Sequence, residues 1–372
     1  MRSLTRIWAL AAKEVRHVLR DPRSLYLALG MPVVMLLLFG YGVSFDLDGL
    51  PLAFVDLDQS QTSRELRQRF TSGPEFVDGG LIDEDEAEGR LVSGRAMAVI
   101  VIEHGFERHL RRGEDAHLQV LIDGSDNNGA TQTRAKTEMM GRIFGFQAAT
   151  RVVSASGSAI EARTWTRFNP ESRSAVFLVP GITAYVLAIV AVLLTALTVA
   201  REWERGSMAQ LFATPVGRLE IVIGKLIPYM VVGTLAVLLV LGVGMWVFDM
   251  PFRGSPLALA VLSVLFLAGM LGQGLFISVL TRNQMVATQA ATMSSMLPSM
   301  LLSGFVFPIE NMPQVLQYIT VVVPARYFVE GLRGVLLRGN GLEELWPNAL
   351  ALLAFALLMM VLSTARFRRT IA

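Results

Sequence analysis

The residues of this chain that could do chemistry do not form the site of an ATPase or a hydrolase. A phosphate-binding loop needs a glycine-rich turn that is followed by Lys and then by Ser or Thr. The nearest match is Gly224-Lys225, but Leu219 stands where the first glycine belongs and Leu226 where the hydroxyl residue belongs. The four histidines form no HExxH pattern, and no serine lies in a GxSxG pattern. We therefore expect that the chain is not an enzyme and binds no ATP or other cofactor itself.

Closely spaced carboxylates are the second group that could do chemistry, as ligands of a metal ion. Asp46 and Asp48 form one pair, Asp56 and Asp58 form another, and segment 123–129 is also acidic, but none has the ligand spacing of an EF-hand loop. Turns and helix caps are the commoner roles of such residues, so we expect no metal site. The chain has no cysteine, which excludes disulfides, thiolate metal sites and cysteine nucleophiles.

The elements that carry these residues are mostly apolar. Of the 372 residues, 53% are hydrophobic and 17% are charged, a composition that indicates a membrane protein. A helix needs about 20 mostly apolar residues to cross a hydrocarbon core of roughly 30 Å. Six stretches meet this requirement, at 24–45, 176–199, 226–247, 257–280, 286–306 and 346–365. No small-residue cleavage site follows the first, which we interpret as an uncleaved anchor.

The basic residues place both ends of the chain on one side of the membrane. They are concentrated before the first span, after the second, between the fourth and fifth and after the sixth: Arg2, Arg6, Lys13, Arg16, Arg20, Arg23, Arg201, Arg205, Arg218, Lys225, Arg282, Arg366, Arg368 and Arg369. By the positive-inside rule this side is the cytoplasm. We predict an amphipathic helix on the inner leaflet over 1–23 and a cytoplasmic tail over 366–372.

A long polar insertion, 46–175, separates the first two spans and has the composition of a soluble α/β domain. Strand-like and helical runs alternate in it, with strands expected at 51–55, 96–102 and 118–122 and helices at 60–70 and 106–111. The predicted fold class is thus a polytopic α-helical membrane protein with six spans and an inserted extracytoplasmic α/β domain.

Two further segments are expected outside the cytoplasm. A long helix over 131–154 carries Met139, Ile143, Phe146 and Val153 at heptad-like spacing, which predicts packing on the strands or on a second copy of the chain. Segment 307–345 is divided by prolines and is predicted to be a re-entrant piece between the fifth and sixth spans.

The fifth predicted span carries a stripe of polar side chains. Gln289, Thr292, Ser295, Ser299 and Ser303 recur at three- and four-residue steps. Such a stripe either lines a substrate path or forms hydrogen bonds between helices, and the pattern favours neither. The six spans contain no Asp, Glu, Lys, Arg or His, whereas ion-coupled transporters usually keep such groups there. This absence argues against a transporter that powers itself.

The loop over 200–225 holds the most specific motif. It reads REWERGSMAQLFATPVGRLEIVIGK from Arg201 to Lys225 and closely resembles the coupling-helix region of ABC transporter permeases of the ABC-2 type. The matching residues are Glu204, Gly206, Ser207, Gln210, Leu211, Thr214, Pro215 and Lys225, whereas Ala209 departs from the acidic residue often found there. The resemblance implies that this helix docks into a cleft of a separate ATPase subunit. Gln210 and Leu211 would then supply a hydrogen bond and an apolar plug.

A second motif extends the resemblance over essentially the whole chain. Segments 302–308, 311–313 and 324–334 resemble the region before the last helix in drug-exporter-like members with a large domain between the first two spans. The resemblance implies a bacterial inner-membrane permease that pairs with a second copy or a paralogue and with two ATPase subunits that hold ATP and Mg. It further implies export of hydrophobic drug-like or lipid-like substrates and a periplasmic adaptor as a candidate partner.

Two alternatives remain. One is a membrane receptor or scaffold whose outer domain binds a ligand without transport, which co-purification of an ATPase would distinguish. The other is a polysaccharide or lipid exporter permease, which the large outer domain disfavours. A net charge of +2 gives no reason to expect a nucleic-acid partner.

Overall fold

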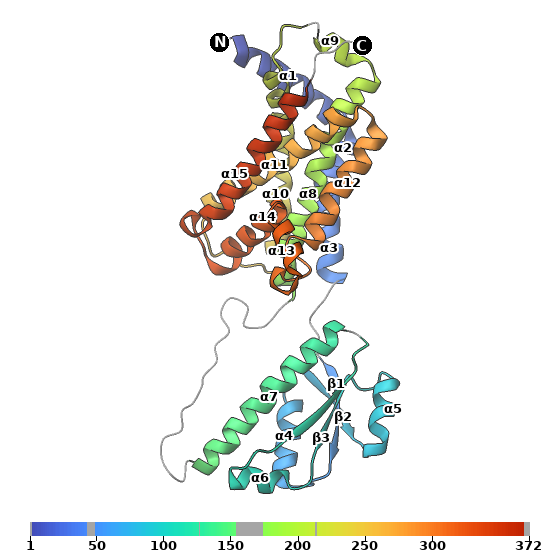
Figure 1. Cartoon of the computed structure of the whole chain (residues 1–372), viewed down its shortest axis with the longest axis vertical. Helices are drawn as coiled ribbons and strands as arrows, with labels where there is room; N and C mark the ends of the chain where they lie inside the picture. The colour runs from blue at the N-terminus through green and yellow to red at the C-terminus, as the bar shows by residue number, and fades with distance from the viewer. Residues whose placement is uncertain (1, 43–48, 126, 154–173, 213, 368–372) are drawn as a thin grey trace. The chain divides into compact units, whose positions relative to one another are not determined.

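The computed structural model describes residues 2–42, 49–125, 127–153, 174–212 and 214–367. The chain divides into two compact units, a helical unit formed by 1–44 and 166–372 and an α/β unit formed by 45–165 (Figure 1). Both connections between the units, together with Asp46, Asp48 and the tail from 368 onward, lie outside the described residues. The predicted domain boundaries at 46 and 175 therefore stay predictions, and each unit is described by itself.

The helical unit consists of helices joined by short loops. Its elements are α1 (Arg2–Leu19), α2 (Pro22–Leu25), the π-helical turn η1 (Tyr26–Gly30), α3 (Met31–Gly42), α8 (Ser174–Glu204), α9 (Ser207–Phe212), α10 (Arg218–Val247), α11 (Pro256–Thr281), α12 (Gln284–Leu301), η3 (Ile309–Asn311), α13 (Gln314–Thr320), α14 (Pro324–Arg333), η4 (Gly334–Arg338) and α15 (Leu342–Arg366).

Within the described residues, four helices are long and apolar enough to cross a membrane: Val176–Glu204, Arg218–Val247, Pro256–Thr281 and Leu342–Arg366. The apolar helix Tyr26–Gly42 is shorter. The fifth predicted span was expected to reach residue 306, but α12 ends at Leu301. Gly304, three residues later, has φ +77°, a left-handed conformation that an α-helix cannot contain. Six spans therefore stay a prediction.

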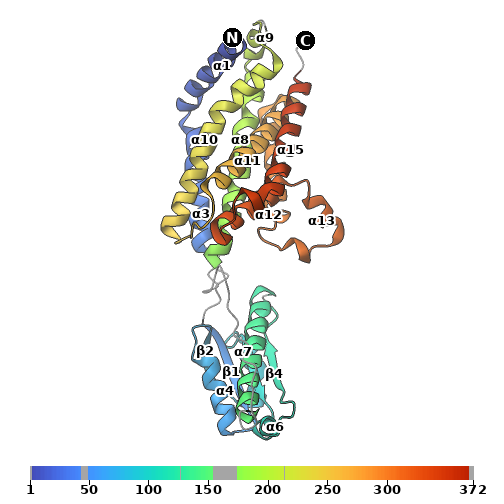
Figure 2. The same ribbon diagram turned by 90° about the vertical axis from the view of Figure 1, so that its left-hand side faces the viewer.

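Helix α8 lies at the centre of the unit, in contact with α3, α10, α11 and α12. Its most apolar stretch is 83% buried, compared with 22% for that of α15 at the periphery (Figure 2). The contact with α11 is the closest, because a Cβ at Gly274 would lie 2.2 Å from the carbonyl oxygen of Val192. Thr195 Oγ1 donates to Leu271 O at 2.8 Å, and Ser278 Oγ accepts from two backbone N–H groups of α8. Small residues and interhelical hydrogen bonds thus join these two helices.

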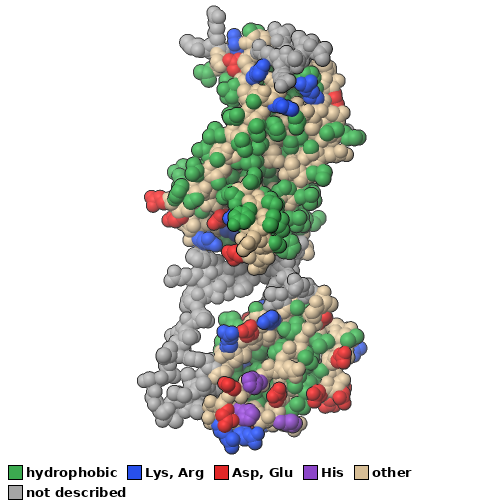
Figure 3. Space-filling view, viewed as in Figure 1, with side chains coloured by type: hydrophobic (Ala, Val, Ile, Leu, Met, Phe, Trp, Pro, Cys, Tyr) green, Lys and Arg blue, Asp and Glu red, His purple; other side chains and the backbone are tan. Residues whose placement is uncertain are grey.

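Helix α1 carries apolar side chains on two faces, one buried and one exposed. Ala11 and Val18 are buried on α10, where Gly224 admits the α1 backbone. Trp8 and Leu19 face outward and are 72% and 65% exposed. Apolar side chains also cover much of the visible surface of this unit, while basic side chains gather near the end that carries α1 and α9 (Figure 3).

The α/β unit is a four-stranded sheet with helices on both faces. Its elements are β1 (Leu50–Asp56), α4 (Gln61–Thr71), β2 (Phe76–Leu81), η2 (Glu84–Glu86), α5 (Ala87–Val92), β3 (Ala98–Ile102), α6 (Phe106–Arg112), β4 (Leu118–Ile122) and α7 (Asn127–Val153). The strand order is β2-β1-β3-β4. Strand β1 is parallel to both of its neighbours, β2 and β3, whereas β4 is antiparallel to β3. The strand β2 was not predicted, because its sequence FVDGGL contains two glycines and an aspartate, which are rare in strands.

Alternating side chains of β1 and β3 fill two cores. Leu52 and Phe54 pack beneath α4, α6 and α7, whereas Val55 and its neighbours pack against α5. Of the two alternatives for the face that carries Met139 and Ile143, packing on the strands is not found, because these side chains are 52% and 37% exposed. Instead, the residues one position later, Met140 and Phe144, pack on the sheet. The side chains of Phe146 and Val153 lie outside the described residues, and packing on a second copy stays a prediction.

Candidate functional site

The predicted coupling segment contains one short helix, α9, set between two helix-terminating residues. Gly206, with φ +70°, separates α8 from α9 in a conformation that favours glycine. At the other end, the Thr214 hydroxyl donates to Leu211 O at 2.6 Å, and Pro215 follows directly. Pro215 O in turn accepts from Arg6 Nη1 at 2.5 Å, so α1 contacts the loop that follows α9. Both ends of α9 are therefore set by residue types that the motif contains.

The side chains of the motif face different ways. Gln210 is exposed and Leu211 half-buried, whereas the Ser207 hydroxyl donates to Glu202 O at 3.3 Å and thus joins α9 to α8. Glu204 is turned toward α12, where its carboxylate accepts from the backbone N–H of Gln284 at 2.8 Å and from the amide of the same residue. Glu204 thus caps α12, a structural role that the sequence did not reveal.

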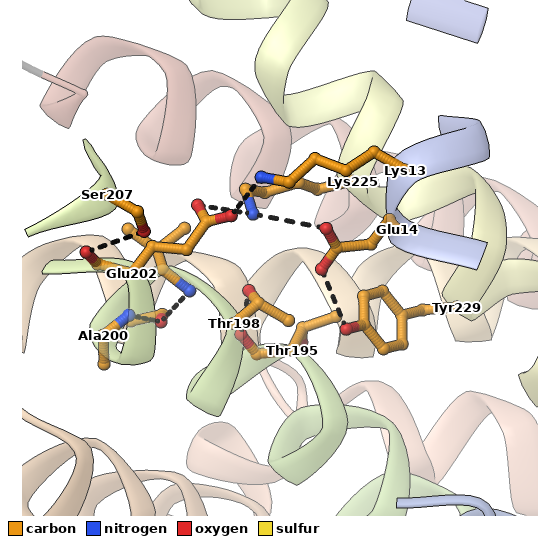
Figure 4. A network of polar contacts seen from close by, with 11 residues as sticks. Lys13, Glu14, Thr195, Thr198, Ala200, Glu202, Ser207, Lys225 and Tyr229 are labelled. Atoms are coloured by element: carbon orange, nitrogen blue, oxygen red, sulfur yellow. Dashed lines mark hydrogen bonds and ion pairs between the residues drawn. The ribbon is translucent and has the colours of Figure 1, made fainter. Parts of the chain in front are cut away.

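A buried network of charged side chains lies beside α9 (Figure 4). Lys225 Nζ lies 2.8 Å from Glu202 Oε2 and 3.7 Å from Glu14 Oε2, and Lys13 Nζ contacts the other oxygen of Glu202 at 3.0 Å. The hydroxyl of Tyr229 donates to Glu14 Oε1 at 3.1 Å. The network joins α1, α8 and α10, and Glu14 and Lys225 are 5% and 4% exposed.

Sequence reasoning missed this network. The sequence identifies Lys225 as a basic residue of the coupling segment but gives it no acidic partner, and it assigns no role to Glu14. The available signal was that Glu14 lies between Ala11 and Val18 on the face of α1 that is buried. A carboxylate at such a position needs a buried partner, because an unpaired buried charge costs several kcal/mol or more.

A cavity of about 450 Å³ lies between α1, α8, α9 and α10. Gln210, Leu211 and Thr214 of the coupling segment line one side of it, and Lys13 and Glu14 of α1 line another. With Ser207, which also lines it, four of the predicted coupling residues are therefore brought together at one cavity, and Glu204 is not among its lining residues.

The candidate substrate-path residues on α12 do not share one environment. Gln289 is exposed, Thr292 is half-buried, and Ser295 and Ser299 are 1% and 2% exposed. The hydroxyls of Thr292 and Ser295 donate to carbonyl oxygens one turn back, at 2.9 and 2.7 Å. Helix α12 packs mainly on α8. A role of the four residues in a substrate path stays a prediction.

The acidic residues that suggested a metal site form turns and caps where the structure describes them. Asp56 accepts from the N–H of Gln59 at 2.8 Å, and Asp58 accepts from the N–H groups of Gly105 and Glu107 at 2.7 and 3.0 Å. Burial raises the pKa of the Asp58 carboxyl, but these bonds and one from Ser60 outweigh burial and lower that pKa below its ordinary value. Asp58 is thus the cap of α6, as turn-and-cap chemistry predicted.

Comparison with known proteins gives a match over nearly the whole chain. The family model described as ABC-2 family transporter protein matches residues 23–365. "Probable multidrug ABC transporter permease YbhS" of Escherichia coli K12 is 36% identical over 369 residues, covering 99% of this chain and 98% of the relative. "Probable multidrug ABC transporter permease YbhR" of the same strain is 29% identical over 98% of this chain and 99% of its own. "Linearmycin resistance permease protein LnrN" of Bacillus subtilis is 23% identical over an alignment that covers 95% of this chain and 97% of the relative.

Proposed function

Since this chain belongs to the ABC-2 transporter family, we propose that it is the membrane-spanning subunit of an ATP-driven exporter, with α9 as the element that a separate ATPase subunit contacts. The observation that carries this proposal is the position of α9. It is a short helix at the surface of the helical unit, it follows α8 directly, and its Ser207 is bonded to α8. A displacement of α9 would therefore act on the most central helix of the unit.

Residues Gly206, Gln210, Leu211, Thr214 and Pro215 form the proposed contact. Gln210 is exposed, and its amide offers both a donor and an acceptor to a partner, while a Cβ added at Gly206 would meet no atom within 4 Å. The Ser207 hydroxyl joins α9 to α8, and the Glu204 carboxylate joins the end of α8 to the start of α12, so both side chains have partners within the helical unit. This division between contacting and supporting residues refines the expectation from the motif.

The proposed assembly follows the family. Two permease copies, or this chain and a paralogue, work with two ATPase subunits that hold ATP and Mg, and a periplasmic adaptor is a further candidate partner. We place six spans in the inner membrane with both termini and α9 in the cytoplasm and the α/β unit outside. This arrangement agrees with the positive-inside rule and with the exposed Trp8 and Leu19 of α1, which suit an inner-leaflet position.

The proposed cargo is a hydrophobic drug-like or lipid-like compound. The names of YbhS and YbhR refer to multidrug transport and that of LnrN to linearmycin resistance, which support an export function of this kind. The outer leaflet or the periplasm is the proposed destination.

The proposal is tested by co-expressing the chain with a candidate ATPase and measuring co-purification and ATP hydrolysis in lipid vesicles. Gln210→Ala should weaken pairing, and Gly206→Val should abolish it, because a β-branched residue is strained at φ +70° and changes the direction of α9. Gly94→Val is the matched control, since Gly94 has φ +66° and open surroundings in the α/β unit. Equal effects of the two valines, or failure of any ATPase to co-purify, would favour the receptor or scaffold alternative.

A further inference from the structure

The cavity beside α9 has the size of a ligand site. Its volume of about 450 Å³ falls within the range of small-molecule pockets, which is roughly 300–1,000 Å³. Its lining residues all belong to the helical unit, namely to α1 and the turn after it, η1, α8 and the turn after it, α9 and the loop after it, and α10. It does not depend on the position of the other unit or on a second copy of the chain.

One part of the cavity is apolar. Val18 and Leu27 line it from one side, and Leu194 and Leu197 of α8 line it from the other. These four side chains have no polar atoms, so this part favours the hydrocarbon portion of a ligand over water. Leu197 is half-buried, so its side chain reaches the cavity without being locked in the core.

In the polar part of the cavity, one cationic side chain has no acidic partner among the described residues. Lys13 is paired with Glu202 at 3.0 Å, Arg201 with Asp21 at 3.3 Å, and Glu14 is held by Lys225 and Tyr229. Arg205 also lines the cavity, and it has no acidic partner among the residues that the structure describes. The Ser207 hydroxyl and the Gln210 amide line the same region. A guanidinium beside such groups favours an anion, in particular a phosphate or a carboxylate.

We propose that this cavity binds an amphiphile with an anionic headgroup, which places its headgroup at Arg205 and its chain against Leu194 and Leu197. The ligand has two sources with the same chemistry, a phospholipid of the membrane and the exported compound. Because Gln210, Leu211 and Thr214 also line the cavity, an occupant contacts the segment that the ATPase is proposed to engage. In that respect the inference rests on the proposed function, and occupancy then adjusts ATP hydrolysis.

Binding is tested on the purified permease alone, in nanodiscs of phosphatidylcholine, with the fluorescent anionic amphiphile 11-(dansylamino)undecanoate as the probe. Saturable binding at one site per chain is expected. Arg205→Ala should weaken it about tenfold, since one charge-assisted contact is lost. Arg205→Lys should restore most of it, and Leu197→Trp should abolish it by filling the apolar part.

Matched controls separate the cavity from general effects. Arg218→Ala removes an exposed positive charge of α10 outside the cavity, and Leu235→Trp enlarges an exposed side chain of α10 that is 51% exposed. Both should bind the probe as the wild type does. Dodecyl phosphate should displace the probe, and dodecyltrimethylammonium should not. Unchanged binding in Arg205→Ala and Leu197→Trp, or equal displacement by the two competitors, would overturn the proposal.

Two further measurements distinguish the sources. Mass spectrometry of co-purified lipid supports a membrane phospholipid if phosphatidylglycerol is retained by the wild type and lost in Arg205→Ala. ATP-driven accumulation of the dansyl probe in vesicles supports cargo if it too depends on Arg205. Absent probe binding with normal ATPase pairing overturns the cavity site alone, whereas normal binding without ATPase pairing overturns the proposed function and the link to α9.

Discussion

Replacing Lys225 with methionine tests whether the buried network stabilises the helical unit. The substitution keeps the length of the side chain but removes the charge that lies 2.8 Å from Glu202 and 3.7 Å from Glu14. Breaking a buried ion pair from one side costs about 3–5 kcal/mol, because the remaining charge stays buried without its partner. Lys13 and Tyr229 still hold one carboxylate each, so we expect the lower end, about 3 kcal/mol.

The assay is thermal unfolding of the purified chain in detergent. For a unit of this size, 3 kcal/mol corresponds to a fall in Tm of roughly 6–12 °C. Lys13→Met is the matched control, because the side chain of Lys13 is 56% exposed and the same replacement should cost less than about 1 kcal/mol. Adding Glu14→Gln to Lys225→Met should recover part of the loss, since it removes a stranded charge.

Equal Tm shifts for Lys225→Met and Lys13→Met would refute this reasoning. The reasoning would also be contradicted if Lys225→Met with Glu14→Gln were more stable than the wild type. The buried pair of Lys225 and Glu14 would then destabilise the wild-type protein.

Two further predictions concern the α/β unit. Asp58→Ala should speed hydrogen exchange at the Gly105 and Glu107 amides and lower the free energy of unfolding by about 1 kcal/mol. In the wild type the folded-state pKa of Asp58 lies below the ordinary 3.8, so this stabilisation is present at neutral pH and is lost as the pH falls through the folded-state pKa. Equal exchange rates in the variant and the wild type would contradict the role of Asp58 as a cap. Phe144→Ala should destabilise the α/β unit by about 3–5 kcal/mol, whereas Ile143→Ala should cost much less, because Phe144 is buried and Ile143 is exposed. The measurement is the urea concentration at which half of the protection of the sheet amides from hydrogen exchange is lost. The reverse order of the two variants would mean that the other face of α7 is buried.

Much of the helical unit was predictable because long apolar runs leave few alternatives. The helices at 176–199, 226–247, 257–280 and 346–365 were all expected, and the structure extends them by a few residues. The first span was expected as a helix over 24–45, and the structure adds a feature that the sequence did not indicate, the π-helical turn η1. Pro32 explains it, since proline has no N–H to donate to the carbonyl four residues back, and the neighbouring Met31 N–H bonds to Tyr26 O instead.

The candidate site was predictable only in part. Gly206 and Pro215 indicated a short helix between them, as found, because both act on the local backbone. The prediction of the ABC-2 family from the motifs is confirmed by the match over 23–365. The network of Glu14, Glu202 and Lys225 could not be found this way, since it joins three helices whose relative positions the sequence does not state.

The close contact between α8 and α11 limits how the helical unit can rearrange. At Gly274 the two backbones approach so closely that even a methyl group has no room, and Ser278 holds two N–H groups of α8. Sliding along this seam would break those bonds and bring larger residues into the position of the glycine. Any change of shape must therefore carry α8 and α11 together as one rigid pair and take place at their outer boundaries, such as the contact of α8 with α12.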